Sequence, residues 1–145
     1  MQFWDSSALL LLVVRQPPFS NRCRRVFRQN VPRAVAFLAR VEFRSAVERL
    51  AREGTLNAAA RRRAFTKIDK LLAAFDIVAF SADVETHALA LLGRYSLRTL
   101  DALQLSCALI RDPRSDTAPR ADLVCCDRKL AEAAVAEGFS LVVKL

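Results

Sequence analysis

Two kinds of apolar pattern alternate along this chain. Continuous apolar runs of strand length, at 34–38 and 77–80, are typical of strands buried on both faces of a parallel sheet. Longer segments carry apolar residues at intervals of three and four, as Phe43 and Val47 do within 41–52. Such spacing predicts a helix with one buried face. The chain therefore alternates predicted strands with predicted helices.

The pattern predicts the order of the elements. Strands are expected at residues 2–4, 34–38, 77–80, 123–126 and 141–143. Helices are expected over 8–14, 41–52, 57–74, 81–95, 99–110 and 128–137, with a basic helix that Ser20 or Asn21 caps and that runs to about Gln29. A polar loop is expected over 112–121. Alternating strands and helices imply a parallel sheet with helices on both faces. We predict an α/β fold of three layers, α/β/α, around a five-stranded parallel sheet, in one domain spanning residues 1–145.

Composition narrows the class of protein. Apolar residues make up 53% of the chain, and 3 glycines and 5 prolines are too few for a collagenous or low-complexity sequence. The longest apolar run, 8–14, is far shorter than the roughly 20 residues of a membrane-spanning helix. The first residues lack the positive charge of a secretory signal, and the four cysteines show no CxxC spacing. We expect a cytoplasmic protein with free thiols and no membrane association.

The positive charge is unevenly distributed. The net charge is +8, yet residues 15–63 hold 13 arginines against three glutamates, while the rest of the chain is slightly acidic. One explanation is an arginine-rich composition with solvated helix faces. The other is a surface for a polyanion, because the guanidinium fork suits phosphate groups. The uneven placement favours a nucleic acid as the partner.

Four carboxylates have positions that call for explanation. Asp5 and Asp127 directly follow predicted strands, and Glu42 lies in the first turn of the helix after the second strand. Each of these three would also serve simply as a helix cap. Asp101 is different, because the residues one and two turns further along its helix are apolar and would partly bury its carboxylate. A buried carboxylate needs a donor, an arginine or a cation.

The predicted topology brings these acids to the same edge of the sheet. Carboxyl ends of parallel strands share one edge of the sheet, so Asp5, Glu42 and Asp127 are expected to converge there. If Asp101 points to the same edge, four carboxylates share one pocket and repel one another unless a divalent cation neutralises them. Oxygen ligands without histidine or cysteine favour Mg²⁺ or Mn²⁺. Such an ion activates water and stabilises the charge of a phosphodiester transition state.

Four segments carry a resemblance to a known family. They are FWDSSAL at 3–9, VEFRSA at 41–46, LRTLDALQL at 97–105 and LVCCDRKL at 123–130. In this order and spacing they resemble the PIN domain family, over essentially the whole chain. The length and the start of the chain resemble the VapC-type toxins of bacterial toxin–antitoxin pairs.

The resemblance implies properties that composition does not. It implies a five-stranded parallel sheet between helices, Mg²⁺- or Mn²⁺-dependent endonucleolytic cleavage of RNA, a homodimer, and a cognate antitoxin that blocks the acidic pocket. Asp5, Glu42, Asp101 and Asp127 fall on the acidic positions of the family. Three hydroxyl residues fall on supporting positions beside these acids: Ser6, Ser7 and Thr99.

These observations lead to a hypothesis of a metal-dependent endoribonuclease. Asp5 and Asp101 would be the core metal ligands, with Glu42 and Asp127 completing the site directly or through water. Two basic runs would contact the RNA backbone: Arg22, Arg24, Arg25 and Arg28 in the first, and Arg61, Arg62 and Arg63 in the second.

One departure keeps a second hypothesis open. Cys125 stands where many members of the family have Ser or Thr, two residues before the last acid, and that hydroxyl often helps to hold the site. The alternative is therefore a catalytically weak module on the same fold that binds RNA or a partner protein. Metal-dependent cleavage of RNA would distinguish the two.

Overall fold

The strands of this protein all run parallel in a single sheet. The computed structural model describes residues 1–112 and 120–142. Within them the sheet has the order β3-β2-β1-β4-β5. Its strands are β1 (Gln2–Trp4), β2 (Arg33–Ala36), β3 (Asp76–Val78), β4 (Asp122–Val124) and β5 (Ser140–Leu141). In the centre, Phe3 of β1 pairs with Ala34 of β2 on one side and with Leu123 of β4 on the other.

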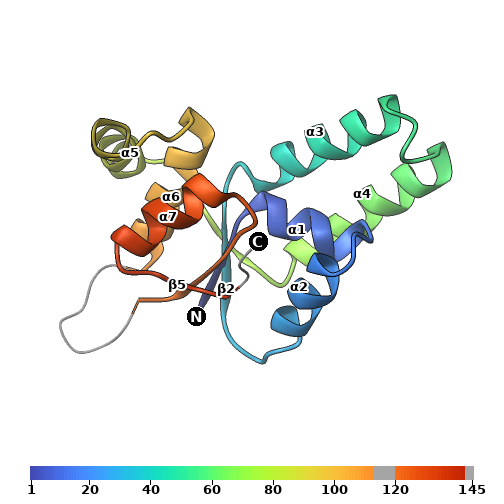
Figure 1. The fold of residues 1–145 in the computed structure, drawn as a ribbon, viewed down its shortest axis with the longest axis horizontal. Helices are drawn as coiled ribbons and strands as arrows, with labels where there is room; N and C mark the ends of the chain where they lie inside the picture. Colours follow the sequence, from blue (N-terminus) through green and yellow to red (C-terminus); the bar gives the residue numbers. More distant parts are fainter. Residues whose placement is uncertain (113–119, 143–145) are drawn as a thin grey trace.

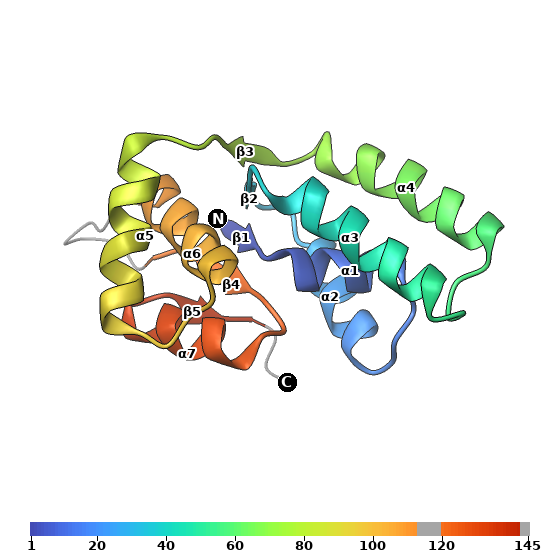
Figure 2. The same cartoon turned by 90° about the horizontal axis from the view of Figure 1, so that it is seen from above.

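Helices cover both faces of the sheet. Those of the described residues are α1 (Ser6–Val13), α2 (Phe19–Phe27), α3 (Ala39–Arg52), α4 (Ala58–Leu72), α5 (Ala82–Arg94), α6 (Thr99–Arg111) and α7 (Arg128–Ala136). Figures 1 and 2 show α5, α6 and α7 on one side of the strands and α1 to α4 on the other. The predicted three-layer α/β/α fold with a five-stranded parallel sheet is confirmed.

Two cores hold these layers together, and the strands contribute to both. Successive side chains of a strand point to opposite faces of the sheet. Phe3 and Leu123 accordingly pack with α5, α6 and α7, whereas the neighbouring Trp4 and Val124 pack with α1 to α4. This explains why these strands are apolar after their first residue, as the sequence pattern indicates. A buried polar side chain here needs partners, and Gln2 at the start of β1 has them in Gln29 and Trp4.

The third strand forms as predicted, but the prediction that it is buried is wrong. The strand β3 forms, but Ile77 is 50% exposed. The reason is that β3 lies at the edge of the sheet and pairs with β2 alone. The apolar run therefore predicted a strand correctly, but it did not predict that the strand lies at the exposed edge of the sheet.

The expected cap of the second helix is also wrong. The helix α2 begins at Phe19, with Pro18 in the N-cap position, so Ser20 and Asn21 lie within its first turn. The hydroxyl of Ser20 instead accepts a hydrogen bond from the backbone N–H of Gln16, at 3.2 Å. A proline at the start of a helix is tolerated because the first N–H groups have no partner within the helix.

Two expectations fall on residues outside this description. Most of the loop expected over 112–121 and the final residue of the last expected strand, Val143, belong to the segments 113–119 and 143–145. Within the described residues, no helix is both long and apolar enough to cross a membrane.

Candidate active site

Asp5 is fixed at the carboxyl edge of the sheet. Its backbone N–H donates to the carbonyl of Val124 in β4, at 3.0 Å. The residue is 4% exposed. Its carboxylate caps α1 by accepting from the N–H of Ser7, at 3.0 Å, and it also accepts from the Ser7 hydroxyl. Both bonds go to Oδ2, so capping accounts for only one oxygen of this buried carboxylate.

Ser7 also ties the segment after β4 to Asp5. The Ser7 hydroxyl accepts a hydrogen bond from the backbone N–H of Cys126 at 3.0 Å while it donates to Asp5. The neighbouring thiol of Cys125 is buried and donates to the carbonyl of Asp127, with 3.6 Å between Sγ and oxygen. Burial raises the pKa of the Cys125 thiol to about 12. Cys125 is thus a neutral donor that supports the segment carrying Asp127.

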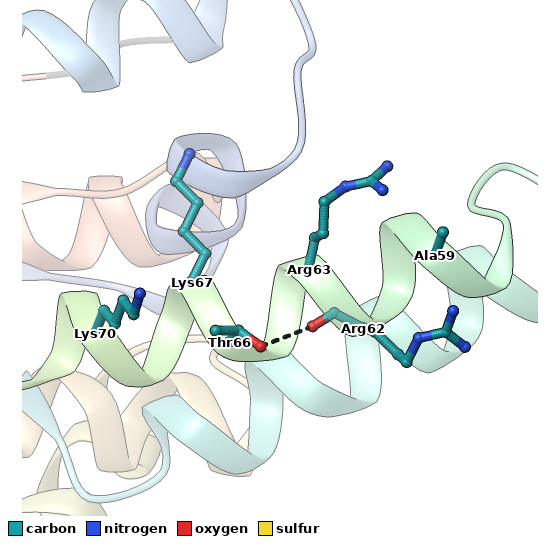
Figure 3. Close-up of a pocket in the computed structure, with 6 residues that line it drawn as sticks. All are labelled: Ala59, Arg62, Arg63, Thr66, Lys67 and Lys70. Carbon is teal, nitrogen blue, oxygen red and sulfur yellow. Dashed lines mark hydrogen bonds between the residues drawn. The ribbon is translucent and has the colours of Figure 1, made fainter.

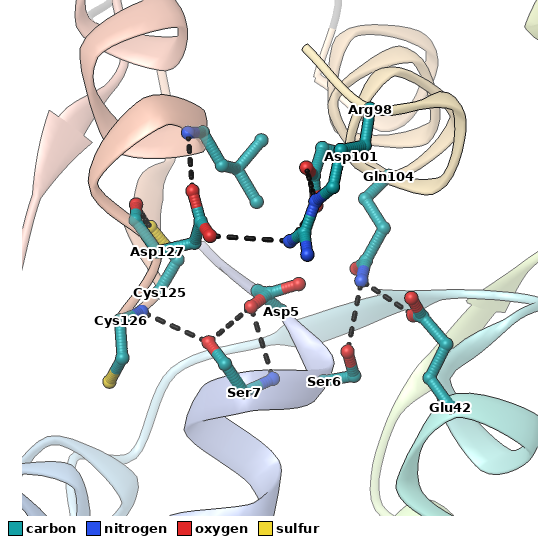
Figure 4. A network of polar contacts seen from close by, with 11 residues as sticks. Asp5, Ser6, Ser7, Glu42, Arg98, Asp101, Gln104, Cys125, Cys126 and Asp127 are labelled. Atoms are coloured by element: carbon teal, nitrogen blue, oxygen red, sulfur yellow. Dashed lines mark hydrogen bonds and ion pairs between the residues drawn. The ribbon is translucent and has the colours of Figure 1, made fainter. Parts of the chain in front are cut away.

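Glu42 is oriented by a buried amide. It lies in the first turn of α3, and its Oε2 accepts from Nε2 of Gln104 on α6 at 2.6 Å. The same Nε2 donates to the hydroxyl of Ser6, at 3.1 Å. Gln104 is fully buried, and its Oε1 has no hydrogen-bond partner among the described residues. Gln104 therefore links α1, α3 and α6 through one side chain (Figure 4).

Arg98 joins the other two acids. Its Nε donates to Oδ2 of Asp101 at 2.8 Å, and its Nη2 donates to Oδ1 of Asp101 at 3.2 Å. Nη2 also reaches Oδ2 of Asp127, at 3.3 Å. The other oxygen of Asp127 caps α7 through the N–H of Leu130, at 3.0 Å. Asp101 and Asp127 are therefore held by a single guanidinium above Asp5 (Figure 4).

The four acids Asp5, Glu42, Asp101 and Asp127 form the acidic pocket, and they carry more negative charge than their donors balance. Burial raises the pKa of Asp5, the charge of Asp101 raises it further, and the hydrogen bonds from Ser7 oppose both effects. The pKa of Glu42 rises from 4.5 to about 7, first because of burial and then because of Asp5 and Asp101, against the opposing effects of Ser6 and Arg98. Carboxylates that raise one another's pKa form a site that a cation would stabilise.

The structure brings most of the predicted site residues together but leaves Thr99 apart from them. The structure brings the four acids together from the end of β1, the first turn of α3, α6 and the cap of α7. Ser6 and Ser7 lie beside them and bond as described above. Thr99 is exposed at the start of α6, and its side chain takes no part in the hydrogen bonds that link the acids in the described residues.

The predicted basic runs lie elsewhere on the molecule. Arg22, Arg25, Arg28, Arg62 and Arg63 are exposed on or just after α2 and on α4, and Arg24 is half-buried. The guanidinium of Arg61 pairs with Glu48 of α3 at 2.9 Å. In Figure 2 the hairpin of α3 and α4, which carries the run at 61–63, extends away from the sheet and from the N-termini of α6 and α7.

A basic hollow of about 460 Å³ lies along α4. It is lined by Ala59, Arg62, Arg63, Thr66, Lys67 and Lys70 (Figure 3). The ammonium group of Lys67 donates to the carbonyl of Leu12 at 3.0 Å, which ties α4 to the end of α1. None of the four acids lines this hollow, so any anion held there would lie away from the acidic pocket.

The acidic pocket suits a divalent cation by its chemistry. Its ligand atoms are carboxylate oxygens, which Mg²⁺ and Mn²⁺ prefer. Within the described residues, however, no three carboxylate, imidazole or thiol groups surround one point closely enough to hold an ion. Arg98 occupies two of the carboxylates and Gln104 binds a third. A cation held by all four acids would therefore meet the positive charge of Arg98 beside Asp101 and Asp127.

Arg98 and Gln104 are the two site residues that sequence reasoning missed. Arg98 stands three residues before Asp101, a spacing at which helical side chains meet, and that spacing was the available signal. Gln104 also stands three residues from Asp101, but its role depends on reaching Glu42 from another element. Nothing in the linear sequence indicates that contact.

Comparison with known proteins agrees with this fold. A family model described as PIN domain matches residues 3–136. The fold is similar to a toxin–antitoxin complex from Klebsiella pneumoniae (TM-score 0.70, 16% identity, 100% of each chain covered). It is also similar to FitAcB from Neisseria gonorrhoeae (TM-score 0.71, 14% identity, 97% of this chain and 96% of that chain). A third similar structure is VapBC2 from Rickettsia felis bound to a DNA fragment from their promoter (TM-score 0.67, 15% identity, 99% and 98%). A search of curated proteins found no match.

Proposed function

This chain belongs to the PIN domain family, and on that premise we propose that it is a metal-dependent endoribonuclease acting as the VapC-type toxin of a toxin–antitoxin pair. The observation that carries the proposal is the acidic pocket. Asp5, Glu42, Asp101 and Asp127 come from four separate elements and meet at the carboxyl edge of the sheet. A structural role as helix caps explains Asp5 and Asp127 only in part, and it does not explain the buried Asp101.

The pocket would hold Mg²⁺ or Mn²⁺ through Asp5 and Asp101, with Glu42 and Asp127 completing the site directly or through water. The bound ion would supply an activated water and would stabilise the charge that develops on the phosphodiester. The chain's own residues prepare the ligands. Ser7 fixes Asp5, and Gln104 turns Glu42 toward the pocket.

We propose RNA as the substrate because the chain is strongly basic. The net charge is +8, and most of the predicted arginines on α2 and α4 are exposed. Exposed arginines can track a phosphate backbone without reading its sequence. Arg61 contributes less than its neighbours, because Glu48 already neutralises its guanidinium.

We also propose an antitoxin partner and a homodimer. The likeness to structures named as toxin–antitoxin complexes supports the antitoxin. Exposed leucines support the dimer, since Leu89 and Leu92 of α5 and Leu100 of α6 lie on the surface of two neighbouring helices. Size-exclusion chromatography with light scattering tests the dimer, and a monomer at micromolar concentration would contradict it. We expect the protein to act in the cytoplasm, where RNA and an antitoxin are present.

The test of the proposed activity is a cleavage assay on mixed RNA. Purified protein, freed of any partner, is incubated with Mg²⁺, with Mn²⁺ or with EDTA. Asp101→Asn is the decisive variant, because asparagine keeps the size of the side chain and can still accept from Arg98. Asp69→Asn is the matched control, since Asp69 is exposed on α4 and pairs only with Arg40 across 3.6 Å in the described residues.

We expect cleavage by the wild type and by Asp69→Asn with metal, and none with EDTA or with Asp101→Asn. Circular dichroism confirms that the variants are folded. An active Asp101→Asn variant would refute the assignment of the site. Salt-sensitive binding of RNA by a folded wild type that never cleaves it would favour the binding module instead.

A further inference from the structure

Arg98 lies against two of the four acids, Asp101 and Asp127. It stands in the N-cap position of α6, but its side chain makes no capping hydrogen bond. Its side chain is 75% exposed, while the side chain of its partner Asp101 is 9% exposed. An exposed guanidinium thus covers a buried carboxylate and reaches across to Asp127 on another element.

Arg98 therefore supplies positive charge to the pocket at the place where a metal ion would bind. Its guanidinium donates to both oxygens of Asp101 and to one oxygen of Asp127. A cation ligated by Asp101 and Asp127 would need the same carboxylate oxygens that Arg98 now occupies. Two positive groups at the same oxygens repel each other, so binding of one weakens binding of the other.

We propose that Arg98 competes with the divalent metal for Asp101 and Asp127 and, once displaced, serves as a phosphate-binding residue for the RNA. This inference rests on the proposed function. The guanidinium can leave because most of its side chain is in solvent and no capping bond holds it. Its planar fork matches a phosphate as well as it matches a carboxylate. Arg98 would then lie beside the acids, at the place where the substrate must come.

The metal half of the proposal is tested without RNA. Mn²⁺ is titrated into metal-free protein by calorimetry, with Arg98→Gln as the variant. Arg49→Gln is the matched control, because it removes the same charge from another exposed ion pair, with Glu53 on α3. Because a bidentate ion pair is among the stronger of the exposed pairs, we expect Arg98→Gln to bind Mn²⁺ about three- to fivefold more tightly than wild type.

Each result of this titration is decisive. Tighter binding by Arg98→Gln, with Arg49→Gln equal to wild type, supports competition. Equal or weaker binding by Arg98→Gln overturns it, and weaker binding would identify Arg98 as a residue that positions Asp101 instead. If the wild type takes up no more Mn²⁺ than Asp101→Asn does, the metal site of the proposed function fails, and this inference fails with it.

The phosphate half is tested by binding without cleavage. Fluorescence anisotropy follows a labelled single-stranded RNA of mixed sequence in Ca²⁺, which occupies oxygen sites. We expect Arg98→Gln to bind this RNA at least about threefold more weakly than Arg49→Gln, and Arg98→Lys to recover part of the loss, because lysine keeps the charge without the fork. Equal RNA affinity of Arg98→Gln and Arg49→Gln would overturn the phosphate role even if metal competition holds.

Discussion

Glu42 makes the stability of the metal-free protein depend on pH. Its pKa rises from 4.5 to about 7, chiefly because α3 half-buries it and then because Asp5 and Asp101 lie close by. Between these two values the folded protein binds a proton that the unfolded chain releases. The contribution of Glu42 to stability is therefore full near pH 4.5 and decreases as the pH rises to about 7, beyond which it is lost.

The size of this loss follows from the two pKa values. The interval from 4.5 to about 7 corresponds to about 3.4 kcal/mol at roughly 1.36 kcal/mol for each pH unit. Glu42 is only partly buried, and solvent screening reduces the effective repulsion, so we expect about 1–2 kcal/mol. Glu42→Gln removes the charge while its carbonyl can still accept from Gln104. The variant should equal the wild type near pH 4.5 and exceed its stability by that amount at pH 8.

Urea unfolding in EDTA at several pH values between 4.5 and 8 measures this difference. The single tryptophan is a suitable probe, because Trp4 is fully buried and packs edge-on against Phe27 and Phe75. Glu53→Gln removes the same charge from the exposed end of α3 and controls for net charge. Parallel stability curves for the wild type and Glu42→Gln across this range would show that Glu42 does not lie in the repulsive environment described above.

Three further predictions concern the support of the site, its ion and the core. Ser7→Ala should lower the free energy of unfolding by about 1–3 kcal/mol, because Asp5 loses a donor and the Cys126 N–H loses its acceptor; an unchanged urea midpoint would contradict this. Mn²⁺ at a hundred times its Kd should stabilise the wild type by about 2.7 kcal/mol and leave Asp101→Asn unaffected, and a gain of equal size in both would place the ion elsewhere. Phe43→Ala, at a fully buried position between α3 and the sheet, should cost about 3–5 kcal/mol in urea unfolding; a loss below 1 kcal/mol would mean that the core closes over the cavity.

The fold was predictable because its pattern is redundant. Each central strand has apolar residues on both faces, and each helix has its own periodic row of apolar residues. A wrong boundary or burial in one element therefore does not change the predicted order of strands and helices. The errors that remain have local causes. The residues of a strand do not determine its position within the sheet. For this reason β3 has the apolar residues of a central strand but the exposure of an edge strand.

The candidate site was predictable to the extent that the backbone determines it. Asp5 and Asp127 follow parallel strands, so topology alone brings them to one edge. The contacts of Arg98 and Gln104 depend instead on where side chains point across elements far apart in sequence. The basic runs show a further limit. Their charge is visible in the sequence, but the sequence does not show that the run at 61–63 lies on the α3–α4 hairpin, which extends away from the sheet.

The four acids of the pocket fall into two pairs by the groups that bind them. The inner pair, Asp5 and Glu42, is bound by neutral donors, and the outer pair, Asp101 and Asp127, is bound by Arg98. Asp5 and Glu42 receive hydrogen bonds from neutral donors and keep raised pKa values, because neutral donors offset burial only in part. Asp101 and Asp127 share the charge of Arg98. A divalent cation would neutralise the inner pair, which in the described residues has no ion pair of its own, and would compete with Arg98 for the outer pair. The same arrangement that weakens the metal-free protein above pH 7 therefore favours exchange of Arg98 for the ion.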